Sequence, residues 1–314
     1  VPPPENGYGS IGPYSVAETV LPHPAWDNQS VYVFYPEGLN QAAPTIFFSH
    51  ALNATKPDIY SALIENIVSQ GYVLVYSPYP GQKDDAKATV GSRYNTLRSG
   101  FDAAVQSYGQ MMDTSKVGFM GHSFGGGATP SIAYSGLVEN GWGNDGSFIF
   151  IMAPWYATEI SLSQLNQIPS STKVVVQVYD EDTVNDHRIA IDLFQEFDVS
   201  EKQYILLESD RSFSQCSLIA DHGVPASIGR EGSRVNALDY YGVFRVVDAL
   251  ADYAFAGSTE GQQLIFGDDD LRFMGNWPNG QGVVQAQITQ SPAPSQSEAE
   301  YRFSASESKS YVDQ

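Results

Sequence analysis

The sequence predicts an α/β domain whose central sheet is mostly parallel and is covered by helices on both faces. The first observation is a series of short apolar runs bounded by polar or glycine-rich residues, at 45–48, 72–76, 117–120, 148–152, 173–179 and 204–207. The second is that helical patterns alternate with these runs, at 59–69, 97–108 and 189–197. Continuous apolar strands that alternate with helices are typical of parallel sheets buried on both faces.

The two ends of the chain depart from this alternation. Residues 30–35 alternate polar and apolar side chains, which predicts an early antiparallel strand. A helix expected over residues 238–255 completes the α/β core. We therefore predict one large domain at 1–256 and a C-terminal extension at 257–314, with short strands near 283–288 and 301–303 and a tail rich in Ser, Gln and Glu.

Composition and charge limit the partners of the chain. Of its 314 residues 42% are hydrophobic, enough to bury a large core, and 36 acidic side chains against 16 basic ones leave a net charge of −20. A surface this acidic repels phosphate backbones and anionic lipids, so nucleic acid is not an expected partner. No run of 18 apolar residues occurs, so no membrane span is expected. The oligomeric state stays open.

The N-terminus and the single cysteine bear on the cellular compartment. The chain begins Val-Pro-Pro-Pro, which is typical of a processed N-terminus and favours a secreted or extracellular protein. Cys216 is the only cysteine, so an intrachain disulfide is excluded. We expect it to be a small buried packing residue rather than a nucleophile.

The strongest functional signal is the pentapeptide Gly-His-Ser-Phe-Gly at residues 121–125, directly after an apolar run. It has the form G-x-S-x-G, which places a serine on a sharp turn between a strand and a helix. Glycines at both ends suit the crowded backbone of such a turn. The small residues Gly126, Gly127 and Ala128 fit the helix entry that follows. Ser123 is therefore predicted to be a nucleophile.

A nucleophilic serine needs a base. In hydrolases built on this strand–turn–helix unit, the acid and then the histidine follow the serine along the chain. The five histidines are His23, His50, His122, His187 and His222. Only the last two follow the serine. His222 is favoured because it lies in a loop after the apolar run at 204–207, whereas His187 begins an expected helix close to the candidate acids.

The acid is expected just after the apolar strand at residues 173–179, because the carboxyl ends of parallel strands meet at one edge of the sheet. Asp182 is the preferred candidate, and Asp180 and Asp186 are alternatives. Asp221 is less favoured, since it is adjacent to His222 in the sequence and adjacent side chains do not readily orient each other's rings.

These residues carry a resemblance to a known superfamily. The stretch 121–127, preceded by Ser-His-Ala-Leu at 49–52, resembles the α/β-hydrolase superfamily. Within it the chain is similar to bacterial cutinase-like polyester hydrolases and their dienelactone-hydrolase-like relatives, through residues 12–14, 69–73, 153–155 and 182–184. It also resembles bacterial platelet-activating-factor acetylhydrolases, through residues 49–52 and 121–126. The resemblance covers residues 8–256.

The resemblance implies a secreted serine esterase that cleaves carboxylic esters through an acyl-enzyme, with Ser123, Asp182 and His222 as its triad. It assigns the oxyanion hole to the backbone N–H groups of Leu52 and Phe124. It also implies that Trp155 lines an acyl or aromatic subsite. His50 stands where these families often carry a structural histidine. No metal and no cofactor are expected.

The expected substrate is a carboxylic ester, polymeric esters included. Only residues 153–172 separate two apolar runs, so no inserted helical lid is expected and the cleft is open to large substrates. The alternatives are a small-ester esterase, a phospholipid acetylhydrolase or a carbohydrate esterase with the same triad. A non-catalytic binding module that keeps the scaffold is a further alternative.

Overall fold

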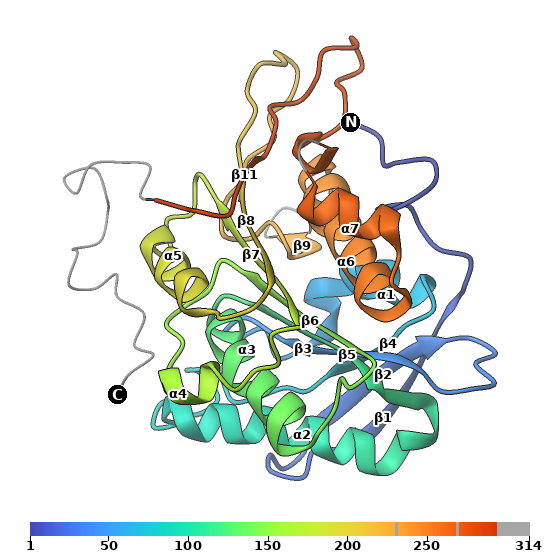
Figure 1. The fold of residues 1–314 in the computed structure, drawn as a ribbon, viewed down its shortest axis with the longest axis vertical. Helices are drawn as coiled ribbons and strands as arrows, with labels where there is room; N and C mark the ends of the chain where they lie inside the picture. The colour runs from blue at the N-terminus through green and yellow to red at the C-terminus, as the bar shows by residue number, and fades with distance from the viewer. Residues whose placement is uncertain (230–231, 268–269, 294–314) are drawn as a thin grey trace.

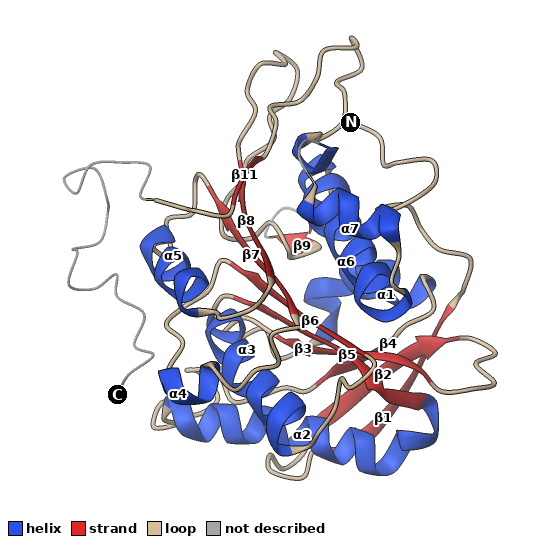
Figure 2. Cartoon of the chain, viewed as in Figure 1, coloured by secondary structure: helices blue, strands red, loops and turns tan. Residues whose placement is uncertain are grey.

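The computed structural model describes residues 1–229, 232–267 and 270–293. Its main feature is a nine-stranded sheet (Figure 2). From one edge to the other the strands are β1 (Val16–Pro22), β2 (Ser30–Pro36), β4 (Val73–Tyr76), β3 (Ala43–Ser49), β5 (Met112–His122), β6 (Gly146–Met152), β7 (Lys173–Tyr179), β8 (Glu201–Leu207) and β11 (Gln287–Thr289). The strands from β4 to β8 in this order pair in parallel, whereas β1, β2 and β11 pair antiparallel. The predicted mostly parallel α/β sheet is confirmed.

Helices cover both faces of the sheet, as Figure 1 shows. One face carries α1 (Ser61–Ser69), α6 (Arg245–Ala256) and α7 (Thr259–Phe266). The other carries α2 (Val90–Tyr108), α3 (Phe124–Tyr134), α4 (Leu162–Leu165) and α5 (His187–Glu196). Shorter pieces are 3-10 turns at Pro57–Tyr60, Gly109–Met111 and Asp270–Arg272, π-helical turns at Ser135–Glu139 and Leu238–Phe244, and the strand pair β9 (Ile228–Gly229) and β10 (Gly232–Ser233).

The central strand β6 shows why its run of apolar residues is unbroken. Phe148, Phe150 and Met152 are buried in the core on the side of α1 and α6. Ile149 and Ile151 are buried in the core on the side of α2, α3 and α5. Successive side chains of a strand point to opposite faces, so a strand with helices on both faces needs an apolar residue at every position.

Two elements near the N-terminus differ from the predicted ones. Strand β1 is not predicted by the apolar pattern, because it lies at the sheet edge with Val16 and Val20 exposed. Helix α2 begins at Val90, earlier than the predicted residue 97. Its first turns are polar, and the signal for its start is Thr89, whose hydroxyl accepts a hydrogen bond from the Ser92 backbone N–H at 3.1 Å.

The C-terminal part continues the same core. The helix expected over residues 238–255 is a π-helical turn followed by α6, and α7 packs next to it with Ile265 fully buried. Of the predicted short strands, the first is β11, shorter than expected, and the second, at 301–303, lies outside the described residues. The expectation of a buried Cys216 is wrong, because this residue is exposed in the loop after β8.

No large lid covers the described part of the fold. Between β6 and β7 the chain forms only the short helix α4, so the prediction of a fold without a lid is confirmed. Across the residues that the structure describes, no helix combines the length and the apolar character that crossing a bilayer requires.

The pairing of β5 with β6 yields a stability prediction. Gly118 lies directly opposite Phe148, and a Cβ at this glycine would overlap the phenylalanine ring. Gly118→Ala should therefore lower the free energy of unfolding by roughly 1–3 kcal/mol through overpacking. Gly109→Ala is the matched control, because no atom lies within 4 Å of the added methyl group. Urea unfolding of both variants tests this, and equal stabilities would contradict it.

Candidate active site

Ser123 lies at the turn between β5 and α3, at the carboxyl end of the parallel strands. Its backbone has φ of 59° and ψ of −123°, a strained combination for a residue with a side chain. Three backbone hydrogen bonds hold it: its N–H donates to Met152 O at 2.9 Å, and its carbonyl oxygen accepts from Gly127 N at 3.0 Å and Trp155 N at 2.8 Å. Strand β6, its following loop and helix α3 therefore impose the strained turn.

The two glycines of the motif are required by close packing. A Cβ on Gly121 would overlap the backbone oxygen of Gly125, and a Cβ on Gly125 would overlap the backbone oxygen of Ser49. The end of β3 thus lies directly against the first turn of α3. The ladder agrees, since Ser49 pairs with Gly121. The loop after β3 is consequently brought next to Ser123.

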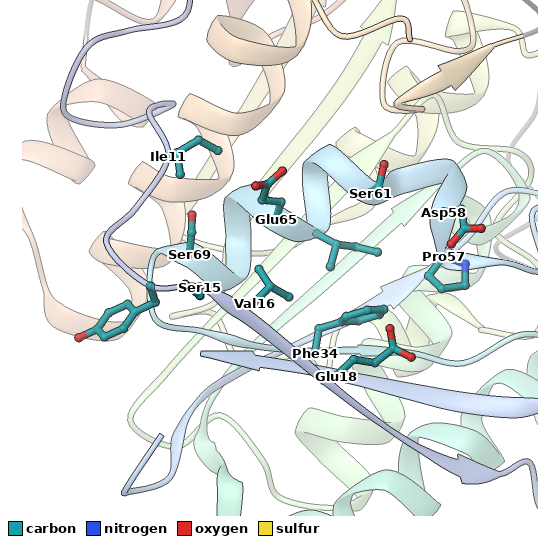
Figure 3. A pocket seen from close by; sticks show the side chains of 12 residues that line it. Ile11, Ser15, Val16, Glu18, Phe34, Pro57, Asp58, Ser61, Glu65 and Ser69 are labelled. Atoms are coloured by element: carbon teal, nitrogen blue, oxygen red, sulfur yellow. The ribbon is translucent and has the colours of Figure 1, made fainter. Parts of the chain in front are cut away.

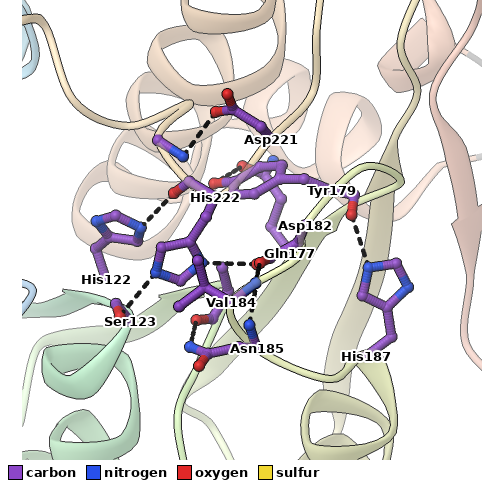
Figure 4. A network of polar contacts seen from close by, with 12 residues as sticks. His122, Ser123, Gln177, Tyr179, Asp182, Val184, Asn185, His187, Asp221 and His222 are labelled. Atoms are coloured by element: carbon purple, nitrogen blue, oxygen red, sulfur yellow. Dashed lines mark hydrogen bonds and ion pairs between the residues drawn. The ribbon is translucent and has the colours of Figure 1, made fainter. Parts of the chain in front are cut away.

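Three predicted residues come together at this edge of the sheet (Figure 4). His222 Nε2 lies 2.8 Å from Ser123 Oγ, and His222 Nδ1 lies 2.7 Å from Asp182 Oδ2. With the ring proton on Nδ1, the imidazole donates to the carboxylate and accepts from the serine hydroxyl. The Asp182 side chain is buried, with 1% exposed, whereas that of His222 is 17% exposed.

The backbone around Asp182 holds its carboxylate in place. Asp182 Oδ1 accepts hydrogen bonds from the N–H groups of Val184 at 2.7 Å and Asn185 at 3.0 Å, which leaves Oδ2 for the imidazole. The side-chain amide of Asn185 in turn donates to Ala153 O at 2.8 Å. The loop after β7 is thereby tied to the loop after β6, beside the serine turn.

The alternative acids and the alternative base have other partners. Asp180 accepts from the Ser209 hydroxyl at 2.7 Å, and Asp186 accepts from the Arg188 guanidinium at 2.6 Å. Asp221 forms an ion pair with Arg234. The His187 ring nitrogen Nε2 lies 2.6 Å from the carbonyl oxygen of Tyr179, to which it donates. The structure thus brings none of these four groups into the Ser123 hydrogen-bond network.

The two candidate oxyanion donors flank the serine turn. Phe124 is the first residue of α3, so its N–H has no acceptor within the helix. His50 Nδ1 donates to Ala51 O at 2.7 Å. A trans peptide directs its C=O and N–H to opposite sides, so this bond fixes the direction of the Leu52 N–H. The Ala51 N–H donates to the Tyr60 hydroxyl at 3.1 Å, which holds the preceding peptide as well.

His122, set aside as a base in the sequence analysis, holds the backbone of the catalytic histidine candidate. Its Nδ1 accepts from the Tyr60 hydroxyl at 2.9 Å, and its Nε2 donates to the carbonyl oxygen of His222 at 2.8 Å. Burial and then the nearby His222 lower the pKa of His122 well below its usual value, so the ring is neutral. The only signal in the sequence was a polar side chain at the end of a buried strand.

Tyr60 is the second residue that the sequence analysis missed. Its hydroxyl lies between the loop after β3 and the end of β5, where it accepts from Ala51 and donates to His122. Burial raises its pKa, so the phenol keeps the proton that it donates. One hydroxyl therefore couples the candidate oxyanion loop to the candidate base, a connection that no local pattern of residues indicates.

Trp155 lies beside the site through its packing on Phe124. The two rings are stacked, with centroids 5.4 Å apart and planes 24° apart. Tyr156 meets the tryptophan ring edge-on at 5.2 Å. Trp155 is partly exposed, whereas Phe124 is buried. A partly exposed aromatic ring therefore lies next to the serine turn.

A groove of about 430 Å³ lies elsewhere, between α1 and the strands β1 and β2 (Figure 3). The apolar side chains of Phe34 and Ile64 and the acidic side chains of Glu18, Asp58 and Glu65 are among those that line it. None of Ser123, Asp182 and His222 lines it, so it is separate from the candidate site.

Two comparisons with known proteins gave no match: no family model matches the chain, and no curated protein is similar enough in sequence to match it.

The buried His50 yields a prediction about acid stability. Burial lowers its pKa to about 3, against an ordinary value near 6.5, so the folded protein loses stability as the pH falls below 6.5. Because His50→Gln cannot titrate, lowering the pH from 7.5 to 4.5 should cost the variant about 2–3 kcal/mol less than it costs the wild type. Urea unfolding of both proteins at the two pH values measures this. The same loss in both proteins would contradict it.

Proposed function

We propose that this chain is a serine esterase of the α/β-hydrolase superfamily, which hydrolyses carboxylic esters through an acyl-enzyme. The observation that carries the proposal is the hydrogen-bonded series from Ser123 Oγ through the His222 ring to Asp182. Its three members follow β5, β7 and β8, and their chain order is serine, acid, histidine. The strained turn at Ser123 supports the same assignment.

The acylation step uses these groups in a defined order. Ser123 Oγ forms a bond to the ester carbonyl carbon while its proton moves to His222 Nε2. Asp182 accepts from Nδ1 throughout and stabilises the imidazolium that forms. When the tetrahedral intermediate collapses, the bond to the alcohol oxygen breaks, and that oxygen takes the proton from Nε2. The acyl group stays on the serine.

Hydrolysis of the acyl-enzyme repeats the sequence with water. His222 Nε2 takes a proton from the attacking water, and the serine oxygen receives it when the acid product leaves. In both tetrahedral intermediates the N–H groups of Leu52 and Phe124 bind the negatively charged oxygen. Each such donor contributes roughly 3–4 kcal/mol in serine hydrolases of known mechanism. Neither step requires a metal or an organic cofactor.

The surroundings of the serine favour bulky ester substrates. The partly exposed Trp155 ring, stacked on Phe124, offers an apolar surface for an acyl or aromatic group. No lid restricts access from the side of the loop after β6. We therefore favour a cutinase-like polyester hydrolase, secreted from the cell, over an esterase limited to small esters, phospholipid acetyl groups or carbohydrate esters.

The proposed nucleophile has a direct test. Ser123→Ala should lower kcat for p-nitrophenyl esters by roughly 10⁴-fold or more, because the acyl-enzyme can no longer form. Covalent labelling by a fluorophosphonate should occur in the wild type and be lost in the variant. Ser131→Ala is the control, since Ser131 is a buried serine on α3, the helix that directly follows Ser123.

The same measurements distinguish an esterase from a non-catalytic binding module. Ester hydrolysis retained by a folded Ser123→Ala variant would remove this serine as nucleophile. A wild type that neither reacts with the fluorophosphonate nor hydrolyses any ester of the series would favour a binding module on the same scaffold. Release of soluble products from a polyester film, set beside p-nitrophenyl esters of increasing chain length, tests the substrate class.

Trp155 provides the second functional prediction. Trp155→Ala should raise KM for aromatic esters roughly tenfold more than for acetate esters, because apolar contact area is lost only under the larger group. Steady-state kinetics on a benzoate and an acetate ester of the same alcohol measure the difference. A similar rise for both esters would show that Trp155 only packs against Phe124 and binds no acyl group.

A further inference from the structure

His222 lies in a long connection without regular secondary structure, between β8 and β9. A general base has to be held accurately, since a displacement of about 1 Å can cost roughly 10²-fold in rate. Three hydrogen bonds hold the backbone beside the ring: His122 donates to His222 O, Glu181 N donates to Ala220 O at 3.0 Å, and Ala220 N donates to the Ser209 hydroxyl at 2.9 Å. All three act on residues 220–222. The start of the connection, from residue 210 onward, is held by other groups.

Asp210 holds that start. Its backbone N–H and carbonyl form hydrogen bonds of 2.8 and 2.9 Å with Leu218, which closes the exposed excursion between them and directs the chain toward His222. The Asp210 carboxylate is 1% exposed. It accepts from the N–H of Ser212 at 2.7 Å, of Val284 at 2.9 Å and of the Trp277 indole at 2.9 Å.

Two of these donors, Trp277 and Val284, belong to the C-terminal segment. They come from the two arms of one turn, and a β-bridge between Asn276 and Gly282 closes this turn. The Trp277 ring is 2% exposed and stacks on Phe213 of the same connection, with centroids 4.9 Å apart and planes 16° apart. Beyond the turn, β11 pairs with β8 and completes the attachment. The segment and the start of the histidine connection therefore form one packed unit.

Because Asp210 is charged, the attachment of the C-terminal segment to the connection depends on the hydrogen-bond donors around its carboxylate. Burial raises the pKa of its carboxyl group, but the hydrogen bonds from Ser212, Val284 and Trp277 together bring the pKa below its ordinary value. The group is therefore ionised near neutral pH. If the donors of the C-terminal segment are removed, a buried carboxylate loses its partners, and the backbone around it has to move toward water to solvate it. Leu218 is bonded to that backbone and leads into His222.

We propose that residues 270–293 position the general base, His222. Trp277 and Asp210 link this segment to the connection that carries His222. The inference rests on the proposed function, because it concerns the same histidine. Trp277 and Asp210 touch no substrate in this scheme and act only through the connection that carries His222.

The test compares two tryptophan substitutions of the same kind. Trp277→Phe keeps an aromatic ring against Phe213 but removes the indole N–H together with part of the ring. Trp142→Phe is the control for the loss of the same ring atoms. Trp142 is partly exposed and stacks on Phe47 at the same 4.9 Å with planes 13° apart, against the opposite face of the sheet from α6. Trp277→Phe should lower kcat for ester hydrolysis and the rate of fluorophosphonate labelling roughly threefold to thirtyfold, with KM within about twofold. The control should change neither.

A spectroscopic measurement makes the test independent of turnover. The proton–nitrogen NMR correlations of the His222 ring, assigned by their loss in His222→Gln, report its hydrogen bonds to Asp182 and Ser123. They should shift in Trp277→Phe and not in Trp142→Phe. A lower melting temperature with unchanged ring signals and unchanged kcat would reduce Trp277 to a stabilising residue and overturn the inference.

Asp210→Asn is the stronger variant. Asp210 Oδ1 accepts from Ser212 and Oδ2 accepts from both Val284 and Trp277, whereas an amide keeps only one acceptor oxygen. Its NH2 group must therefore face either Ser212 or the other two donors, so the effect of this variant should exceed that of Trp277→Phe. If it does not fold, Trp277→Phe alone decides. A wild type without fluorophosphonate labelling would remove the proposed function, whereas the ring signals of the two tryptophan variants still decide whether the segment positions His222.

Discussion

The close approach of β3 to the first turn of α3 is the constraint on which the candidate site depends. It exists because Gly125 carries no Cβ, so the carbonyl oxygen of Ser49 can lie against the helix, while Gly121 allows the end of β5 to pack against the same turn. This approach brings the loop with Leu52 beside Ser123, whose strained backbone is held by hydrogen bonds to β6, its following loop and α3. A methyl group at Gly125 would push away the end of β3 and with it the loop of Leu52, one of the two candidate oxyanion donors.

Three histidines meet at this edge of the sheet, and their surroundings give them different roles. His50 and His122 are buried, and burial keeps both rings neutral, so each can donate one hydrogen bond and accept another with a fixed tautomer. His222 is partly exposed between a serine and a carboxylate. The two buried rings donate to the backbone carbonyls of Ala51 and His222, so they orient the peptide groups of the site.

The sequence predicts those parts of the site that depend on local backbone geometry or on chain order. The motif around Ser123 indicates the turn, and the order of strands places Asp182 and His222 at the same edge. The role of His122 could not be predicted, because its partner is a backbone carbonyl 100 residues away. The same limit applies to Asp210 and Trp277, which are 67 residues apart. Polar contacts between residues so far apart in the chain leave no periodic pattern in the sequence. The start of α2 was missed for another reason, because its first turns are polar and show no apolar periodicity.

The C-terminal segment also covers an edge of the sheet. Without β11, strand β8 would be an open sheet edge, and such edges favour pairing with other chains. Covering that edge requires the chain to pass the end of β8, which is where the connection to His222 begins. The buried apolar side chains of the segment, among them Leu271, Met274 and Trp277, pack into the core on the side of α6. The interactions that protect the sheet edge are therefore continuous with those that hold the histidine connection, and a change in one is transmitted to the other.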